Sequence, residues 1–315
     1  MQATIRTVAH FDGVGLHSGA PVHLAIRPAP VGHGIVFQRR DLATALGDAA
    51  LIPARWDMVT PSQLCTFLDN GRGATLSTVE HVMAALAGTG IHNALIEVAG
   101  AEVPILDGSS APFVRGILRA GIATQDSPLR AIRVLKPVEI RDGAAFARLE
   151  PADHLEIDFH IEFADAAIGR QDKTLDMANG AFLRELMDSR TFCRQSDVDA
   201  MRRSGKALGG TYLNAVVVDG AQVLSPGGLR HADEAVRHKM LDALGDLTLA
   251  GAPLLARYTG HRAGHAMTNR LLRALFADPD AWEWTVCSPD QENRQPGAGV
   301  AAYGAAAGEE TALAG

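Results

Sequence analysis

Two stretches of the chain show the same succession of hydrophobic and polar positions. Each begins with an alternating segment that ends at a proline turn, continues with an amphipathic helical pattern closed by glycine, and ends in a β-like run. The paired segments are residues 23–29 and 146–152, residues 80–88 and 237–245, and residues 94–98 and 253–257. We interpret this pattern as a duplicated unit of strands and helix. Chance likeness between ordinary strand–helix–strand units is the alternative.

The second unit is longer than the first. It carries about 34 additional residues before its helix, and segments this long inside a compact domain are often functional. We place this insertion at about residues 191–228, where residues 215–220 resemble a strand and a turn. A polar, turn-forming stretch at residues 125–128 indicates a domain boundary. The prediction is a first domain of residues 1–126, a second of residues 127–295 and an Ala/Gly-rich flexible tail of residues 296–315.

Composition narrows the class of protein. Hydrophobic residues make up 47% of the chain, which is enough for a real core, and the net charge of −7 argues against a nucleic-acid partner. The three cysteines are far apart and form no CxxC pair, which excludes a disulfide framework and favours a reducing, cytoplasmic setting. No apolar run reaches about 18 residues and no signal peptide is recognisable, so we expect neither a transmembrane segment nor export.

Candidate chemistry comes from residue spacing, because a lone histidine means little among twelve. His238 and Asp242 are four residues apart on a predicted helix, so both side chains return to nearly the same face and could converge on one cation such as zinc. Asp246 lies on that face one turn further on. An ordinary surface pair on an amphipathic helix is the alternative explanation.

The equivalent helix of the first unit begins with Glu80 and His81. If the two units meet face to face, His81 joins His238 and Asp242, and two histidines with one carboxylate form a catalytic zinc set that leaves a position for water. Glu80 could then take a proton from that water, although the chain has no HExxH signature. A helix-capping role is the alternative for Glu80, because residues 77–80 resemble a capping arrangement.

His265 is a further candidate. The flanking glycines predict a loop at this position, followed by a helix that opens at residues 267–269. A loop histidine near a metal could serve as a general acid, whereas a surface residue without a role in chemistry is the ordinary alternative.

Six segments resemble motifs of the UDP-3-O-acyl-N-acetylglucosamine deacetylase family. They are residues 13–19 (GVGLHSG), 77–81 (STVEH), 104–113 (PILDGSSAPF), 189–192 (SRTF), 236–246 (VRHKMLDALGD) and 264–266 (GHA). Each would be weak alone, but all six occur in order over most of the chain, from nearly the first residue to about Trp284. Together they make the resemblance highly specific.

This resemblance implies a fold and a reaction. The fold would be α+β, with two similar β-α-α-β sandwich domains packed helix layer to helix layer and an insertion in each. The reaction would be hydrolysis of the N-acetyl group of UDP-3-O-[(3R)-3-hydroxyacyl]-N-acetylglucosamine, the committed step of lipid A biosynthesis. It would use one zinc ion (Zn2+) per chain, bound by His81, His238 and Asp242.

The resemblance also implies roles for the residues around the metal. Glu80 would be the general base, and His265, held by Asp246, would stabilise developing charge and protonate the leaving amine. Thr191 would donate a hydrogen bond to the oxyanion. Substrate contacts would come from Lys239, Phe192, Leu16 and His17. The first two of these have ordinary alternatives, a solvated lysine and a phenylalanine of the core.

Some positions depart from the family pattern. Arg194, Gln195 and Ser196 make the insertion more polar than an apolar passage for an acyl chain, and residues 259–262 lack the expected aromatic–lysine pair. A zinc amidohydrolase for another acylated sugar and a non-catalytic paralogue are therefore the competing hypotheses. The ligand set would also accept iron(II) or cobalt. We expect a monomer that binds a small-molecule substrate.

Overall fold

The structure is a computed structural model that describes residues 1–62 and 64–300. Most of the predicted tail, residues 301–315, lies outside the described residues. No helix in the described part of the chain is long and apolar enough to cross a membrane.

Five strands near the N-terminus form one mixed sheet. They are β2 (Ala9–Val14), β3 (Pro21–Pro28), β4 (Ile35–Arg39), β5 (Leu51–Pro53) and β9 (Ala94–Ala99). Their order is β2-β3-β9-β4-β5, with β9 in the middle, antiparallel to β3 and parallel to β4. Alternate residues of β9 are buried, because successive side chains of a strand point to opposite faces and one face is turned to the core.

Seven strands from the second half form another sheet. They are β11 (Arg130–Val134), β12 (Val138–Asp142), β13 (Ala145–Pro151), β14 (Glu156–Glu162), β15 (Arg170–Asp176), β19 (Leu254–His261) and β20 (Trp282–Val286). The main path is β12-β13-β19-β11-β20, and β14 joins β19 to β15. β19 is antiparallel to β13 and parallel to β14. It therefore repeats the pairing of β9 with β3 and β4.

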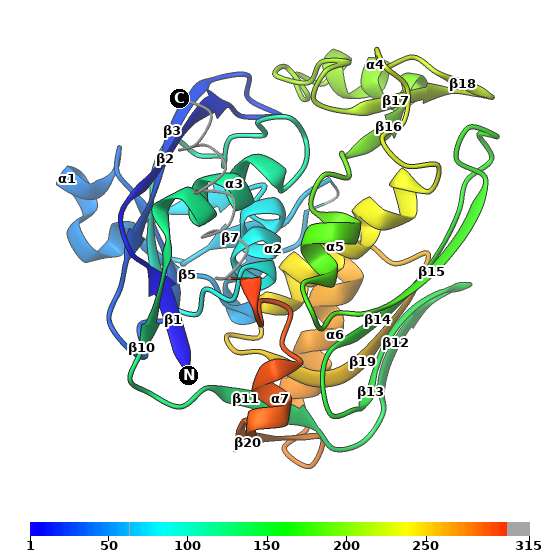
Figure 1. Ribbon diagram of the computed structural model, residues 1–315. Coiled ribbons are helices and arrows are strands. Elements are labelled where there is room, and N and C mark those ends of the chain that lie inside the picture. The colour runs from blue at the N-terminus through cyan, green and yellow to red at the C-terminus, as the bar shows by residue number, and fades with distance from the viewer. Residues whose placement is uncertain (63, 301–315) are drawn as a thin grey trace, which may run out of the picture.

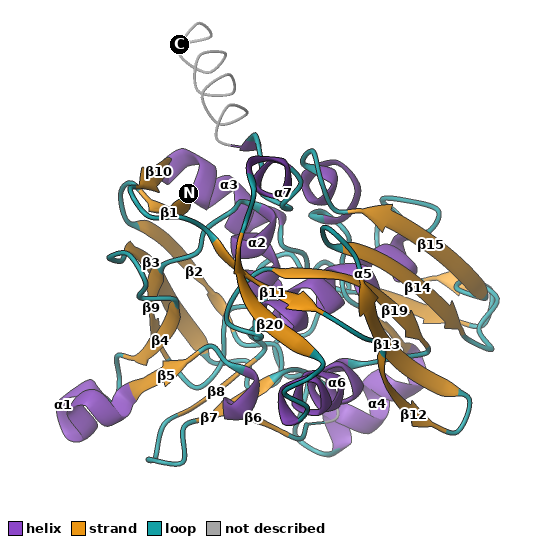
Figure 2. Ribbon diagram, turned by 90° about the horizontal axis from the view of Figure 1, so that it is seen from below, coloured by secondary structure: helices purple, strands orange, loops and turns teal. Residues whose placement is uncertain are grey.

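Helices fill the space between the two sheets (Figures 1 and 2). They are α2 (Glu80–Gly88), α3 (Ala111–Ala120), α5 (Glu234–Thr248) and α6 (His265–Ala277). α2 packs against α5, α3 against β2, and α6 against β12 and β13. Every residue of α2 except Ala87 is buried, as expected for a helix that is apolar on nearly all sides.

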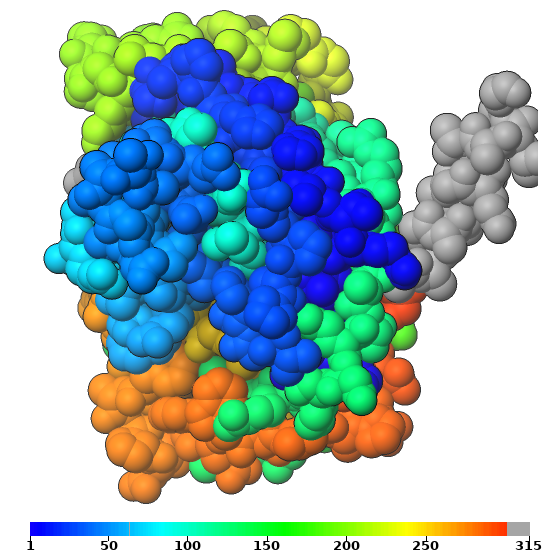
Figure 3. All heavy atoms as spheres, turned by 90° about the vertical axis from the view of Figure 1, so that its left-hand side faces the viewer, coloured from blue at the N-terminus to red at the C-terminus, as the bar shows by residue number. Residues whose placement is uncertain are grey.

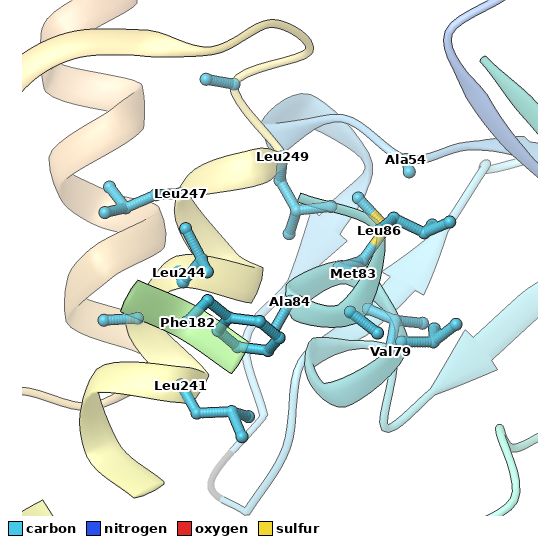
Figure 4. Close-up of a cluster of buried hydrophobic side chains, with 14 of the residues drawn as sticks. Ala54, Val79, Met83, Ala84, Leu86, Phe182, Leu241, Leu244, Leu247 and Leu249 are labelled. Carbon is cyan, nitrogen blue, oxygen red and sulfur yellow. The ribbon is translucent and has the colours of Figure 1, made fainter. Parts of the chain in front are cut away.

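The contact between α2 and α5 is made by small and aliphatic side chains, with the ring of Phe182 beside them (Figure 4). Two glycines of these helices permit very close contacts, one with the backbone of the other helix and one with the Phe182 ring. A Cβ atom on Gly245 of α5 would lie 2.1 Å from the backbone oxygen of Glu80, and one on Gly88 of α2 would lie 1.9 Å from the Phe182 ring. Glycine permits this approach because it has no Cβ.

Smaller elements surround this centre. They are the three-stranded sheet β6 (Val59–Thr60), β7 (Phe67–Asp69) and β8 (Thr75–Ser77), the strand pair β1 (Gln2–Ile5) and β10 (Ile122–Gln125), and the short helices α1 (Ala43–Leu46) and α7 (Pro289–Asn293). A second three-stranded sheet consists of β16 (Phe192–Arg194), β17 (Val216–Asp219) and β18 (Gln222–Val223), with α4 (Gln195–Arg203) beside it.

The segment that carries α4 reaches across to the N-terminal residues. Figure 3 shows its yellow-green atoms against the blue N-terminal part of the chain. The backbone N–H groups of Leu208 and Gly209 donate hydrogen bonds to the carbonyl oxygens of His17 and Leu16, at 3.2 and 3.1 Å. The two halves of the chain are therefore joined here as well as at α2 and α5.

The structure confirms the predicted strands and the helix predicted at residues 80–88. It also confirms a fold that combines helices with several separate β-sheets. Two helix boundaries were wrong. α5 extends beyond residues 237–245 at both ends. α6 begins at His265, because Gly264 is its N-cap in an extended conformation. Gly260 and Gly264 predicted a loop that includes His265, but this histidine is the first residue of a helix.

Candidate metal centre and active site

The first turn of α2 brings Glu80 and His81 into the interior. Thr78, just before the helix, has a left-handed backbone (φ 61°), which is uncommon for residues other than glycine. No side chain caps the helix at Val79. Instead, Glu80 Oε2 accepts a hydrogen bond from the backbone N–H of Thr66 at 3.0 Å. The capping arrangement expected at residues 77–80 is therefore not formed, because no side chain caps Val79 and the Glu80 carboxylate bonds to a neighbouring segment.

α5 presents His238, Asp242 and Asp246 as buried residues spaced by four, as the helical period predicts. The Nδ1 of His238 lies 3.0 Å from the backbone oxygen of Ser189. A carbonyl oxygen only accepts, so Nδ1 carries the proton and donates it. The Nε2 lone pair is left for a metal, in the arrangement common among metal-binding histidines.

His81, His238 and Asp242 offer ligand atoms that all lie within 4.8 Å of one another. Asp242 Oδ1 is 3.2 Å from Nε2 of His238 and 3.7 Å from Nε2 of His81. This oxygen is buried and has no hydrogen-bond partner among the described residues. A buried carboxylate oxygen without a partner is costly, and a cation would satisfy it. The three side chains therefore fit a divalent metal ion.

The pKa values of these groups suit metal binding. Burial lowers the pKa of His81, which favours the neutral imidazole that a metal requires. Burial alone would raise the pKa of Asp242, but the charges of His238 and Lys239 hold it well below its ordinary value. The Lys239 ammonium is 3.0 Å from Asp242 Oδ2. Lys239 is thus paired with a carboxylate of the metal-binding group, and it is not an ordinary solvated lysine.

Glu80, Asp246 and His265 form a second charged group beside the first. Nδ1 of His265 is 2.8 Å from Asp246 Oδ2, and Nε2 is 3.9 Å from Glu80 Oε1. Burial would lower the pKa of His265, but the carboxylates of Asp246, Asp242 and Glu80 raise it to about 9. Burial raises the pKa of Glu80 to about 7, against the opposing charge of His265. One group can therefore donate a proton near neutral pH while its neighbour can accept one.

Phe192 and Thr191 lie at the border of this region. The Phe192 ring stands edge-on to His238 and Phe163, with centroid distances of 6.2 and 5.4 Å. Thr191 is fixed through its backbone, since its N–H donates to Gly108 and its carbonyl oxygen accepts from Val216, at 2.8 and 2.7 Å. No hydrogen bond within the described residues joins the Thr191 side chain to the metal-binding group.

Leu16 and His17 belong to a turn held by the buried carboxylate of Glu102, which accepts hydrogen bonds from the backbone N–H groups of His17 and Ser18. Both ring nitrogens of His17 are buried and lack a partner in the described structure, and burial lowers the pKa of this histidine. No hydrogen bond or ion pair between described residues connects Leu16 or His17 to the metal-binding group. The structure places the two residues against the α4 segment.

Sequence reasoning missed two residues that contact the site. Ser189 supplies the carbonyl oxygen that orients His238, and Thr66 bonds to Glu80. The backbone oxygen of Ser189 has no sequence signal at all. Thr66 lies in a short loop whose pattern points neither to a helix nor to a site, so only the folded chain reveals its neighbours.

One cavity of the described structure lies away from the metal-binding group. It has a volume of about 470 Å³, and its lining includes Ala87, Gly90, Leu244 and Leu247. These residues come from the C-terminal ends of α2 and α5, and the lining contains none of the three metal-binding side chains. This cavity is therefore separate from the metal-binding group.

Comparison with known proteins places this geometry in a family. Residues 2–277 match the model of a family described as UDP-3-O-acyl N-acetylglycosamine deacetylase. Curated relatives include the UDP-3-O-acyl-N-acetylglucosamine deacetylase of Phenylobacterium zucineum (strain HLK1), which is 48% identical over 89% of this chain and 95% of its own. The enzymes of the same name from Xanthomonas oryzae pv. oryzae (strain PXO99A) and Shewanella frigidimarina (strain NCIMB 400) are 44% and 45% identical. They cover 94% and 90% of this chain, and 96% and 92% of their own lengths. The chain therefore belongs to the UDP-3-O-acyl N-acetylglycosamine deacetylase family.

Proposed function

We propose that this chain hydrolyses the N-acetyl group of UDP-3-O-[(3R)-3-hydroxyacyl]-N-acetylglucosamine, giving acetate and the free amine, as the committed step of lipid A biosynthesis. The proposal is carried by one observation: His81, His238 and Asp242 form a buried cluster of side chains, and Glu80 lies next to it. The names of the curated relatives support the substrate. The three cysteines form no disulfide, which suits the reducing cytoplasm as the place of reaction.

Zinc is the proposed metal, one ion per chain, held by His81, His238 and Asp242. This donor set of two imidazoles and a carboxylate is that of catalytic zinc sites, with iron(II) and cobalt as the alternatives. When bound, the ion would polarise the amide carbonyl and lower the pKa of a water molecule. All ligands come from a single chain, so a monomer suffices.

The side chains around the metal-binding group divide the proton transfers between them. Glu80 accepts a proton from the attacking water, whose oxygen adds to the acetyl carbon. His265 carries a proton on Nε2 and gives it to the sugar nitrogen as the C–N bond breaks. Asp246 accepts from Nδ1–H of His265 and so keeps the charged imidazole in this orientation.

Roles in binding are proposed for the remaining candidates. Thr191 donates a hydrogen bond to the oxyanion, and Lys239 contacts the polar head of the substrate. Phe192, Leu16 and His17 line the space for the rest of the molecule. The position of Phe192 beside His238 supports its assignment.

We also propose that the chain consists of two similar sandwich domains, residues 1–126 and 127–295, packed helix layer to helix layer. The insertion of the second would comprise residues 191–228, and the three-stranded sheet β6-β7-β8 would be the smaller insertion of the first. The matching strand pairings around β9 and β19 support this division. So does the packing of α2 against α5.

Metal removal tests the proposed function directly. Chelator-stripped protein should release no acetate from the acylated UDP-N-acetylglucosamine, and one equivalent of zinc should restore the activity. The reason is that the buried Asp242 oxygen has no hydrogen-bond partner among the described residues and needs a cation. Acetate release is measured with several acyl lengths and with other N-acetylated sugars. Activity that is indifferent to stripping would contradict the metal assignment. Turnover of other sugars alone would favour the competing amidohydrolase hypothesis.

The pH dependence of kcat/KM should be bell-shaped. Activity needs Glu80 ionised and His265 protonated, so it should rise with pH through the pKa of Glu80 and fall through the pKa of His265. The rising limb is expected at or below about pH 7, because a bound cation would lower the pKa of Glu80 from this value. The falling limb is expected at or below about pH 9, because the same cation would also lower the pKa of His265. A pH profile of initial rates checks this, and a plateau that extends above pH 10 would contradict the role of His265.

A further inference from the structure

Thr66 contacts two carboxylates of the site from a part of the chain that the motifs do not include. It lies directly before β7 and is only 3% exposed. Its backbone N–H donates to Glu80 Oε2 at 3.0 Å, and its hydroxyl Oγ1 donates to Asp246 Oδ1 at 2.5 Å. The donors are unambiguous, because an ionised carboxylate only accepts.

The other oxygen of each carboxylate faces His265. Asp246 Oδ2 is 2.8 Å from Nδ1 of that histidine, and Glu80 Oε1 is 3.9 Å from its Nε2. Thr66 and His265 thus stand at opposite sides of the same carboxylate pair and close a ring of four residues. Each carboxylate is held by Thr66 at one oxygen, which restrains its rotation and so the position of the oxygen turned to the imidazole.

The segment that carries Thr66 is itself held in place. Its backbone oxygen accepts from the N–H of Thr78 at 3.0 Å, which ties it to the residues that precede α2. Asp246 follows Thr66 by 180 residues and belongs to α5. The hydroxyl bond therefore crosses from the segment next to α2 to the opposite helix.

We propose that Thr66 is a positioning residue for the deacetylation, which sets the orientation of Glu80 and, through Asp246, that of His265. The hydroxyl is the essential group for Asp246, whereas the contact to Glu80 comes from the backbone N–H and is kept by any residue here except proline. This inference rests on the proposed function for its kinetic consequence, while the orientation of His265 is a property of the protein alone.

The test compares three variants of zinc-loaded protein. Thr66→Val replaces the hydroxyl by a methyl group of similar size and should lower kcat by about 10- to 100-fold with KM nearly unchanged. Thr66→Ser keeps the hydroxyl and should stay within about threefold of the natural protein. Thr89→Val is the matched control, because Thr89 is buried at the other end of α2 and its hydroxyl donates to the Ala85 carbonyl.

If the role of Thr66 were only structural, Thr66→Val and Thr89→Val would lower kcat by the same factor, or Thr66→Val would raise KM as much as it lowers kcat. Either result would overturn the proposal. Full activity of Thr66→Val would do so as well. If that variant does not fold, Thr66→Ala replaces it in the same comparison. The imidazole N–H resonance of His265 is followed in parallel by NMR. This resonance should shift in Thr66→Val but not in Thr89→Val, whether or not the natural protein turns over the acetylated sugar. A natural protein without activity on that sugar would refute the proposed function but not the orientation of His265 by Thr66.

Discussion

Glu80→Gln is expected to lower kcat by about 10²- to 10⁴-fold without loss of bound zinc, the usual contribution of a positioned general base. The amide has nearly the same shape and still offers an oxygen to the N–H of Thr66, but it cannot take a proton from water. Glu80 is not among the three metal-binding side chains, so the metal should remain.

Acetate release and zinc content are measured on the same preparation. Glu97→Gln is the matched control, because Glu97 is also largely buried but is paired with Arg27 and Arg40 on the sheet. It should keep the activity of the natural protein. A Glu80→Gln protein that binds one zinc and retains more than about a tenth of kcat would show that another group accepts the proton.

Gly245→Ala should disrupt the site through the fold. The added Cβ would lie 2.1 Å from the backbone oxygen of Glu80 and 2.9 Å from its carbonyl carbon, so α2 and α5 must move apart. Overpacking of this kind costs about 1–3 kcal/mol of unfolding free energy, sometimes more. Displacement of a site by about 1 Å can lower turnover 10²-fold, and here His81 would move relative to His238 and Asp242.

Urea unfolding and zinc affinity measure the two consequences. Gly264→Ala serves as the control, since nothing lies within 4 Å of its added Cβ and its φ of −139° suits alanine. This control should keep the zinc affinity of the natural protein and lose only about 1 kcal/mol of stability, the cost of alanine at an N-cap. Unchanged zinc affinity in Gly245→Ala would mean that the helices can separate without moving the ligands.

The sequence predicts the metal-binding group better than the residues that support it. His238 and Asp242 were found because the helical period repeats every 3.6 residues, and His81 because the second unit repeats the first. Contacts between segments without periodicity produce no recognisable pattern in the sequence. The bond from Thr66 to Asp246 joins a loop to a helix, and the orienting oxygen of Ser189 belongs to the backbone.

The errors at helix starts have a similar origin. The residues before Glu80 have the composition of a capping box, but the left-handed backbone of Thr78 and the bond from Thr66 turn the carboxylate elsewhere. Gly260 and Gly264 indicated a loop through His265, yet Gly264 is the N-cap of α6. At Glu80 a tertiary contact outweighed a weak local preference, whereas at His265 the glycine acts as an N-cap, a position that it also favours.

The pairing of α2 with α5 has a consequence for how the protein is made. His238 leaves the ribosome 157 residues after His81, which at 5–20 residues per second takes about 8–30 s. During that interval the apolar surface of α2 has no α5 to cover it, and the two histidines cannot share an ion. Nascent chains should therefore depend on chaperones that shield hydrophobic surface, and metal should be acquired only late in synthesis or after release.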